Sequence, residues 1–166
     1  MFVTSCSPGP NNIVASYSGF NFGVLKTIPH MCGVIFGFTT LVTIMNFGLV
    51  NVFQKYPIIQ EILKYTGTLF LIYLAYKISF SKTNSDSEKK NPVKFIETFF
   101  FQYLNPKGVM VAIIVVSTYV ELGENYINYA TQVVLLAFLF SSTSITLWTF
   151  IGKFFFFFAT NDNFIK

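Results

Sequence analysis

Two proline-containing breaks lie inside apolar stretches, and they constrain the fold more than any other feature of the chain. The first is the run Ser7-Pro8-Gly9-Pro10-Asn11-Asn12, and the second is Asn105-Pro106-Lys107. Proline removes a backbone donor and interrupts helical hydrogen bonding. In hydrocarbon an unpaired backbone group costs several kcal/mol, so such a break persists only where protein or a water-filled cavity satisfies it. Paired breaks in two halves of a membrane protein indicate a transporter's binding site.

The composition places these breaks in a membrane protein. Hydrophobic residues make up 53% of the 166 residues and charged residues only 11%, whereas soluble domains carry roughly 25% charged residues. The net charge of +4 comes from lysines that lie mostly in loops, so it concerns membrane orientation, and no nucleic-acid partner is expected. Cys6 and Cys32 are interpreted as packing residues. Neither a metal nor another cofactor is expected.

The apolar pattern predicts an all-α, polytopic helical membrane protein. About five hydrophobic segments are expected, and they lie at residues 1–22, 31–53, 58–80, 95–120 and 129–151. A spanning helix needs about 20 predominantly apolar residues, so the stretch before Pro8 is too short for a full span. It is either a re-entrant segment or the remainder of a longer first helix, and the second interpretation is favoured. Residues 19–30 are expected to form a turn region.

The polar run SKTNSDSEKKN divides the chain into two halves of one transporter domain, 1–166. The first half is 1–80, the connecting loop is 81–94, and the second half is 95–166. Lysines concentrate in this loop, after the first segment and in the C-terminal tail. The positive-inside rule therefore predicts a cytoplasmic central loop and an external N-terminus.

Small and polar residues in the segment 31–53 predict close helix packing. Gly33 and Gly37 form a small-xxx-small pattern, which allows helices to approach closely. Thr39, Thr43 and Asn46 follow at i, i+4 and i+7, so they share one helix face. This polar stripe would either line a pathway or make interhelical hydrogen bonds.

The second break carries a lysine in mid-membrane, which makes it a candidate functional site. Such a lysine costs at least about 2.5–3.5 kcal/mol. Thr98, Gln102 and Asn105 lie at i, i+4 and i+7 before it, so their polar groups converge on one face. This pattern favours a site for a zwitterionic solute with Lys107 as the charge partner of its carboxylate. The alternative is a kinked helix whose lysine extends to the membrane interface.

The first break offers the same solute a second set of donors. Asn11 and Asn12 supply carboxamides, and a helix that begins there presents free N–H groups and a positive dipole end. The alternative is a tight turn at the membrane surface. His30 and Glu97 are the candidates for proton binding. A polar residue at a helix start and a charge at the interface, respectively, are the simpler interpretations.

Taken together, these motifs resemble those of the LysE/RhtB amino-acid exporters. The resemblance covers essentially the whole chain, and it rests on the run 7–12, Gly19-x-x-x-Gly23, Pro29-His30, Gly33-x-x-x-Gly37, Tyr65-x-Gly67, the run 71–77, the run 100–107 and Trp148-x-x-x-Gly152-Lys153. It implies a six-helix secondary exporter of 3+3 inverted-repeat architecture in the bacterial inner membrane, driven by an ion gradient. Most of the first helix and all of the sixth would then be absent.

The resemblance also implies which residues bind substrate. By correspondence with the family motifs, and together with Asn12 and Gln102, the expected substrate-binding residues are Pro8, Gly9, Pro10, Asn11, Asn12, Gln102, Asn105, Pro106 and Lys107.

The leading hypothesis is a transporter that exports amino acids or related small zwitterions, in exchange for protons. The alternative is a non-transporting membrane remnant or a membrane interaction subunit. An enzyme is not expected, because no nucleophile and base occur at catalytic spacing. A missing helix would leave an exposed surface that favours a homo-oligomer.

Overall fold

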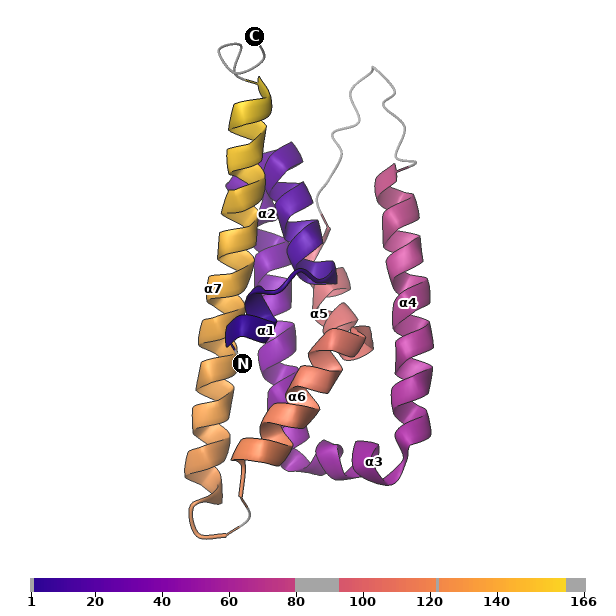
Figure 1. Ribbon diagram of the computed structural model, residues 1–166, viewed down its shortest axis with the longest axis vertical. Coiled ribbons are helices and arrows are strands. Elements are labelled where there is room, and N and C mark those ends of the chain that lie inside the picture. Colours follow the sequence, from indigo (N-terminus) through magenta and orange to yellow (C-terminus); the bar gives the residue numbers. More distant parts are fainter. Residues whose placement is uncertain (1, 80–92, 122, 161–166) are drawn as a thin grey trace.

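The computed structural model describes residues 2–79, 93–121 and 123–160, and its regular elements are all helical (Figure 1). They are α1 (Phe2–Cys6), α2 (Pro10–Ile44), the π-helix η1 (Met45–Leu49), α3 (Val50–Lys55), α4 (Pro57–Ser79), α5 (Phe95–Leu104), α6 (Pro106–Tyr119) and α7 (Tyr126–Thr160). Most of the predicted central loop, 81–94, lies outside the described residues.

α2 is a helical hairpin that reverses at one residue. Gly23 adopts φ 77° and ψ 171°, a conformation open mainly to glycine. The reversal brings Ser18 within 2.9 Å of Thr27, hydroxyl to hydroxyl, although nine positions separate them. The expected turn region of 19–30 is therefore wrong in extent, because a single positive-φ glycine makes the turn and helix continues on both sides. We call residues 10–22 the first arm and residues 24–44 the second arm.

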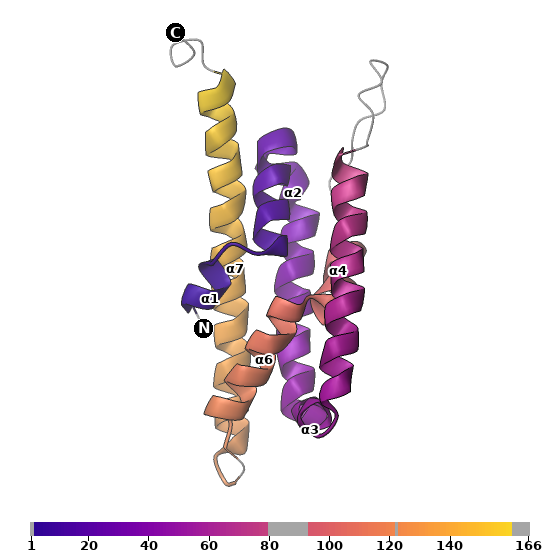
Figure 2. The same cartoon turned by 45° about the vertical axis from the view of Figure 1, so that its right-hand side comes forward.

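The first arm begins near the middle of the molecule and not at its end. Its 13 residues span about 20 Å at 1.5 Å per residue, less than the ~30 Å hydrocarbon core of a membrane. In both cartoon views the short α1 lies at the same height as the start of this arm (Figures 1 and 2). The first break, which separates α1 from the first arm, therefore lies near the middle of the molecule along its long axis.

The second break separates α5 from α6. These helices meet at Asn105 with a bend of 61°. In Figure 2 α6 inclines across the bundle, whereas α7 runs nearly straight beside it. Along the long axis of the molecule, α5 and α6 run in the opposite direction to the first arm (Figure 1).

The membrane assignment rests on long apolar helices. Two stretches in the described part of the chain, Pro10–Gly48 and Tyr126–Phe158, are long and apolar enough to cross a membrane, and the bent pair α5–α6 adds a third if it is one span. α4 occupies nearly the whole predicted segment 58–80. It is not one of the stretches that meet this length and apolarity criterion in the described part of the chain. The prediction of an all-α polytopic membrane protein is confirmed.

Glycines let the helices pack at short distance around the breaks. A Cβ on Gly33 or Gly37 would lie 2.7 Å from backbone atoms of α5, so the small-xxx-small prediction of close packing is confirmed. Gly67 of α4 lies directly against the Leu104 carbonyl at the second break. The described bonds of the predicted polar stripe are intrahelical: the hydroxyls of Thr39 and Thr43 and the amide nitrogen of Asn46 each donate to a carbonyl four positions earlier.

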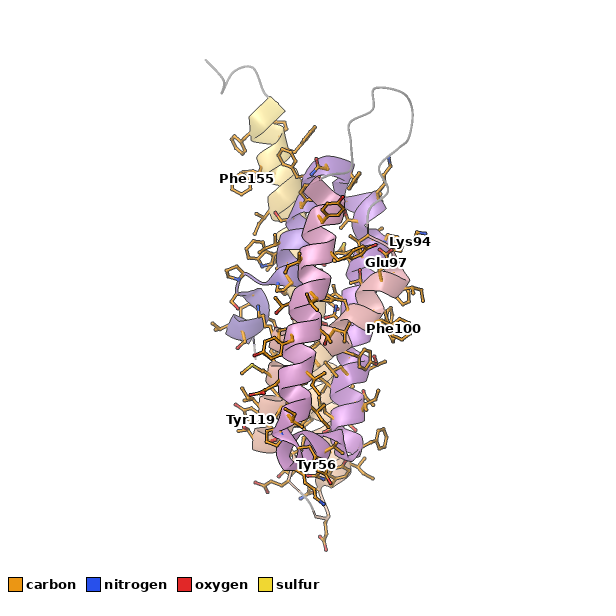
Figure 3. All side chains as sticks on the ribbon, turned by 90° about the vertical axis from the view of Figure 1, so that its right-hand side faces the viewer. Tyr56, Lys94, Glu97, Phe100, Tyr119 and Phe155 are labelled. Atoms are coloured by element: carbon orange, nitrogen blue, oxygen red, sulfur yellow. The ribbon has the colours of Figure 1, made fainter. Side chains whose placement is uncertain are left out.

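The two ends of the bundle differ in their side chains. Lys94 and Phe155 lie toward one end, and Tyr56 and Tyr119 lie at the other (Figure 3). We refer to these as the Lys94 end and the Tyr119 end. The lysine pattern predicts that the Lys94 end faces the cytoplasm.

Candidate functional site

A cavity lies where the two helix breaks meet. Its volume of about 60 Å³ holds roughly four to six waters, at about 10–15 Å³ each by the same measure. We call it the central cavity. Its lining comes from α1, both breaks, the second arm, α5, α6 and α7, and comprises Thr4, Ser5, Gly9, Pro10, Asn11, Asn12, Val34, Phe38, Gln102, Asn105, Lys107, Gly108, Val111, Ser141 and Ser144.

The first break leaves the last carbonyls of α1 without helical partners, and three side chains from α2 and α7 donate to the carbonyls of this region. Ser144 of α7 donates its hydroxyl to the Ser5 carbonyl at 2.7 Å. Trp148 of α7 donates its indole N–H to the Cys6 carbonyl at 3.0 Å. Asn12 donates to the Ser5 and Ser7 carbonyls at 2.8 and 3.0 Å. The break is thus satisfied by protein, as a break at membrane depth must be.

An amide pair joins the first break to α5, three residues before the second break. The Asn11 side chain donates to Gln102 Oε1 at 2.8 Å, and Gln102 Nε2 donates back to Asn11 Oδ1 at 3.2 Å. Gln102 Nε2 also donates to the Thr98 carbonyl at 2.9 Å, and Gln102 is buried. We call this contact the Asn11–Gln102 pair; it couples the first break to α5.

Lys107 places a positive charge between the breaks. Its Nζ donates to the Ser7 carbonyl at 2.8 Å. A Cβ on Gly9 would meet this side chain at 2.9 Å, so the glycine makes room for the lysine. An ammonium has three donors, and the Ser7 bond occupies one of them. Because Lys107 also lines the central cavity, a bound anion would lie within its reach.

The cavity also contains a buried acceptor and two helix N-termini. Asn105 is only 3% exposed, and its Oδ1 has no hydrogen-bond partner. α2 begins at Pro10 and α6 at Pro106, so the first N–H groups of both helices, which have no intrahelical partner, border the cavity. Among the described residues, none that lines this cavity is acidic. A ligand with one carboxylate and one ammonium group matches this set of donors and acceptors.

A buried histidine connects the first break to α5. The simpler interpretation of this residue, a polar residue at a helix start, is wrong. His30 is 2% exposed and lies within the second arm. Its Nδ1 lies 2.9 Å from Thr98 Oγ1, and its Nε2 lies 3.3 Å from the Asn11 carbonyl. The Pro29-His30 motif gave a signal in the sequence, but the partners lie 68 and 19 positions away.

Comparison with known proteins identifies the family of this chain. The sequence model of the LysE type translocator family matches residues 2–163. The chain belongs to this family. It is therefore an integral protein of the inner membrane, and the names of the family and of its members indicate a transporter.

Individual relatives of the translocator have related names. It is 26% identical over 153 residues to the cysteine/O-acetylserine efflux protein of Salmonella choleraesuis, across 92% of this chain and 78% of the relative. The protein of the same name from Escherichia coli K12 is 25% identical over 156 residues, with the same coverage. No solved structure matches the chain significantly.

Seven of the nine predicted substrate-binding residues line the central cavity of the translocator, and the two others do not. Pro8 is exposed and Pro106 is half-buried. Both shape a break: Pro8 lies between the end of α1 and the start of α2, and Pro106 opens α6. Substrate binding by any of the nine remains a prediction. Ser141 and Ser144 of α7 also line the cavity, and the sequence pattern did not single them out.

We expect Trp148→Phe to destabilise the translocator by about 0.5–1.5 kcal/mol, because it removes the indole N–H that donates to the part-buried Cys6 carbonyl. The midpoint of thermal unfolding in detergent measures the effect. Phe150→Leu is the control, since Phe150 lies on the same helix and is exposed. An equal midpoint for Trp148→Phe and the wild type would contradict this role for the indole.

Proposed function

We propose that the chain exports amino acids or closely related small zwitterions from the cytoplasm, as a secondary transporter driven by protons. The observation that carries the proposal is that Lys107, two helix N-termini and Asn105, whose Oδ1 is unpartnered, all border one cavity. The relatives named as cysteine/O-acetylserine efflux proteins support the substrate class.

The substrate carboxylate would bind between Lys107 and the helix N-termini. Charge-assisted hydrogen bonds contribute about 1.5–3 kcal/mol each, and helix N-termini bind anions without further help. The substrate would compete with the Ser7 carbonyl for one lysine donor. The ammonium group of the substrate would bind Asn105 Oδ1, which is otherwise buried without a partner.

The size of the cavity favours a small side chain. Space for roughly four to six waters accommodates a solute with few heavy atoms beyond its carboxylate and ammonium groups. Val34, Phe38 and Val111 provide the apolar part of the lining. The absence of acidic residues from that lining disfavours solutes with a second positive charge.

Counterflow in proteoliposomes tests this proposal. Vesicles that contain the purified protein and are preloaded with unlabelled L-cysteine are expected to take up labelled L-cysteine. O-acetyl-L-serine is expected to compete, whereas cysteamine, which lacks the carboxylate, is expected to compete at least about tenfold more weakly, since tenfold corresponds to about 1.4 kcal/mol. Equal competition by cysteamine would contradict the carboxylate site. No counterflow of any amino acid would instead favour a non-transporting membrane protein.

A further inference from the structure

A second, smaller cavity lies next to the central one, on the side of the Lys94 end. Its volume of about 10 Å³ is about that needed for one water. Its lining includes Asn11, His30, Glu97 and Thr98. Asn11 also lines the central cavity, so the Asn11–Gln102 pair stands between the two. We call this smaller space the His30 cavity.

The hydrogen bonds of His30 define its tautomer. A backbone carbonyl accepts only, so Nε2 must carry the proton that it donates to the Asn11 carbonyl. In the neutral ring Nδ1 is then an acceptor, and it accepts a hydrogen bond from the Thr98 hydroxyl at 2.9 Å. Neutral His30 is therefore fully hydrogen-bonded.

The same partners also satisfy the protonated ring. When Nδ1 gains a proton it becomes a donor, and the Thr98 oxygen accepts it. The Thr98 hydroxyl is then free to donate to the Lys94 carbonyl, which lies 3.2 Å away. Rotation of one hydroxyl thus leaves neither form with an unpaired polar atom on the ring or on Thr98.

We propose that His30 is the proton-binding group that couples proton movement to the substrate cavity. This inference rests on the proposed function. Its coupling route is short, because Asn11 and Thr98 hold the imidazole and also hold the Gln102 amide. A proton on Nδ1 reorients the Thr98 hydroxyl and strengthens the hydrogen bond to the Asn11 carbonyl. Other groups of the same two residues, the Thr98 carbonyl and the Asn11 side chain, hold the Gln102 amide.

The charged groups around His30 are few. In the part of the chain that the structure describes, Glu97 is the ionisable side chain that shares the His30 cavity, and it lies beside Lys94 at the start of α5 (Figure 3). Lys94 contributes its backbone carbonyl to Thr98 and is itself exposed. Lys107 lies beyond the Asn11–Gln102 pair, in the central cavity. The nearby core from α7 is apolar, with Ile145 and Trp148 packed near Val34.

His30→Gln provides the first test, in proteoliposomes with an imposed pH gradient. With one proton exchanged per substrate, the wild type is expected to accumulate L-cysteine about tenfold per pH unit, because one unit and a tenfold ratio are the same free energy. His30→Gln is expected to lose this accumulation and the accompanying proton flux, while counterflow without a gradient continues. A merely structural role for His30 would reduce both activities together.

Thr98 provides the second test, which does not depend on the folding of the histidine variant. Thr98→Val removes the hydroxyl and is expected to lose gradient-driven accumulation, whereas Thr98→Ser retains the hydroxyl and keeps it. Thr149→Val is the matched control, because Thr149 is buried and its hydroxyl donates only within α7.

The outcomes separate this inference from the proposed function. Full accumulation by His30→Gln, or by Thr98→Val, would overturn the role of His30 and leave export intact. Counterflow by the wild type without any response to a pH gradient would overturn proton coupling altogether. Absence of wild-type counterflow would overturn the proposed function itself.

Discussion

Lys107→Met is expected to lower the apparent affinity for amino acids by about 10- to 150-fold. The estimate corresponds to the loss of one charge-assisted interaction of about 1.5–3 kcal/mol with the substrate carboxylate. Methionine keeps most of the side chain's length and apolar contacts, so the effect reports the charge. Counterflow of L-cysteine over a range of concentrations measures it.

The control for this experiment is Lys153→Met on α7. Lys153 is exposed and does not line the central cavity, so its loss is expected to leave the affinity unchanged. Lys107→Arg is expected to recover only part of the affinity, because the guanidinium is larger than the space beside Gly9. Wild-type affinity in Lys107→Met would show that the lysine only secures the Ser7 carbonyl.

The second large effect is expected from Gly19→Leu and Gly152→Leu. Each glycine lies directly against a backbone carbonyl across the α2–α7 interface: Gly19 against Thr149, and Gly152 against Ser16. Overpacking a core usually costs about 1–3 kcal/mol, and here the obstacle is backbone, which cannot change rotamer. Both variants should therefore exceed that range and yield little folded protein, measured as the monodisperse fraction in detergent.

Gly108→Ala separates this packing argument from a general intolerance of glycine substitutions. A Cβ on Gly108 would meet its nearest neighbours at 3.6 Å, an ordinary van der Waals contact, so its folded yield should match the wild type. Normal yields of Gly19→Leu and Gly152→Leu would mean that α2 and α7 separate more easily than their contact indicates.

The convergence of the two breaks could be predicted from the sequence, because proline and polar residues inside apolar helices have few favourable locations. Proline positions are local signals, and the requirement to satisfy free carbonyls brings such positions together. The partners of those carbonyls could not be predicted. Ser144 and Trp148 lie on a helix whose apolar face is clear, but helical periodicity does not show which helix that face meets.

The burial of His30 and its hydrogen-bond partners could not be predicted for a related reason. A single histidine after a proline indicates a polar residue at a helix start, and nothing in its immediate surroundings indicates burial. Its burial depends on Gly23, which reverses the chain so that the second arm packs beside the Asn11 carbonyl. A one-residue reversal leaves little trace in the hydrophobic pattern, so the expected turn was placed too broadly.

The satisfaction of the α1 carbonyls has a consequence for biosynthesis. The α7 side chains that donate to the Ser5 and Cys6 carbonyls, Ser144 and Trp148, lie 139 and 142 positions later in the chain. At about 5–20 residues per second, a ribosome needs roughly 7–28 seconds to reach those donors. During that interval the first break must stay in water or against the insertion machinery. A chain that stalls before α7 would thus expose an unpaired carbonyl that quality control could recognise. Once α7 is made, its side chains would pair with that carbonyl and remove the signal.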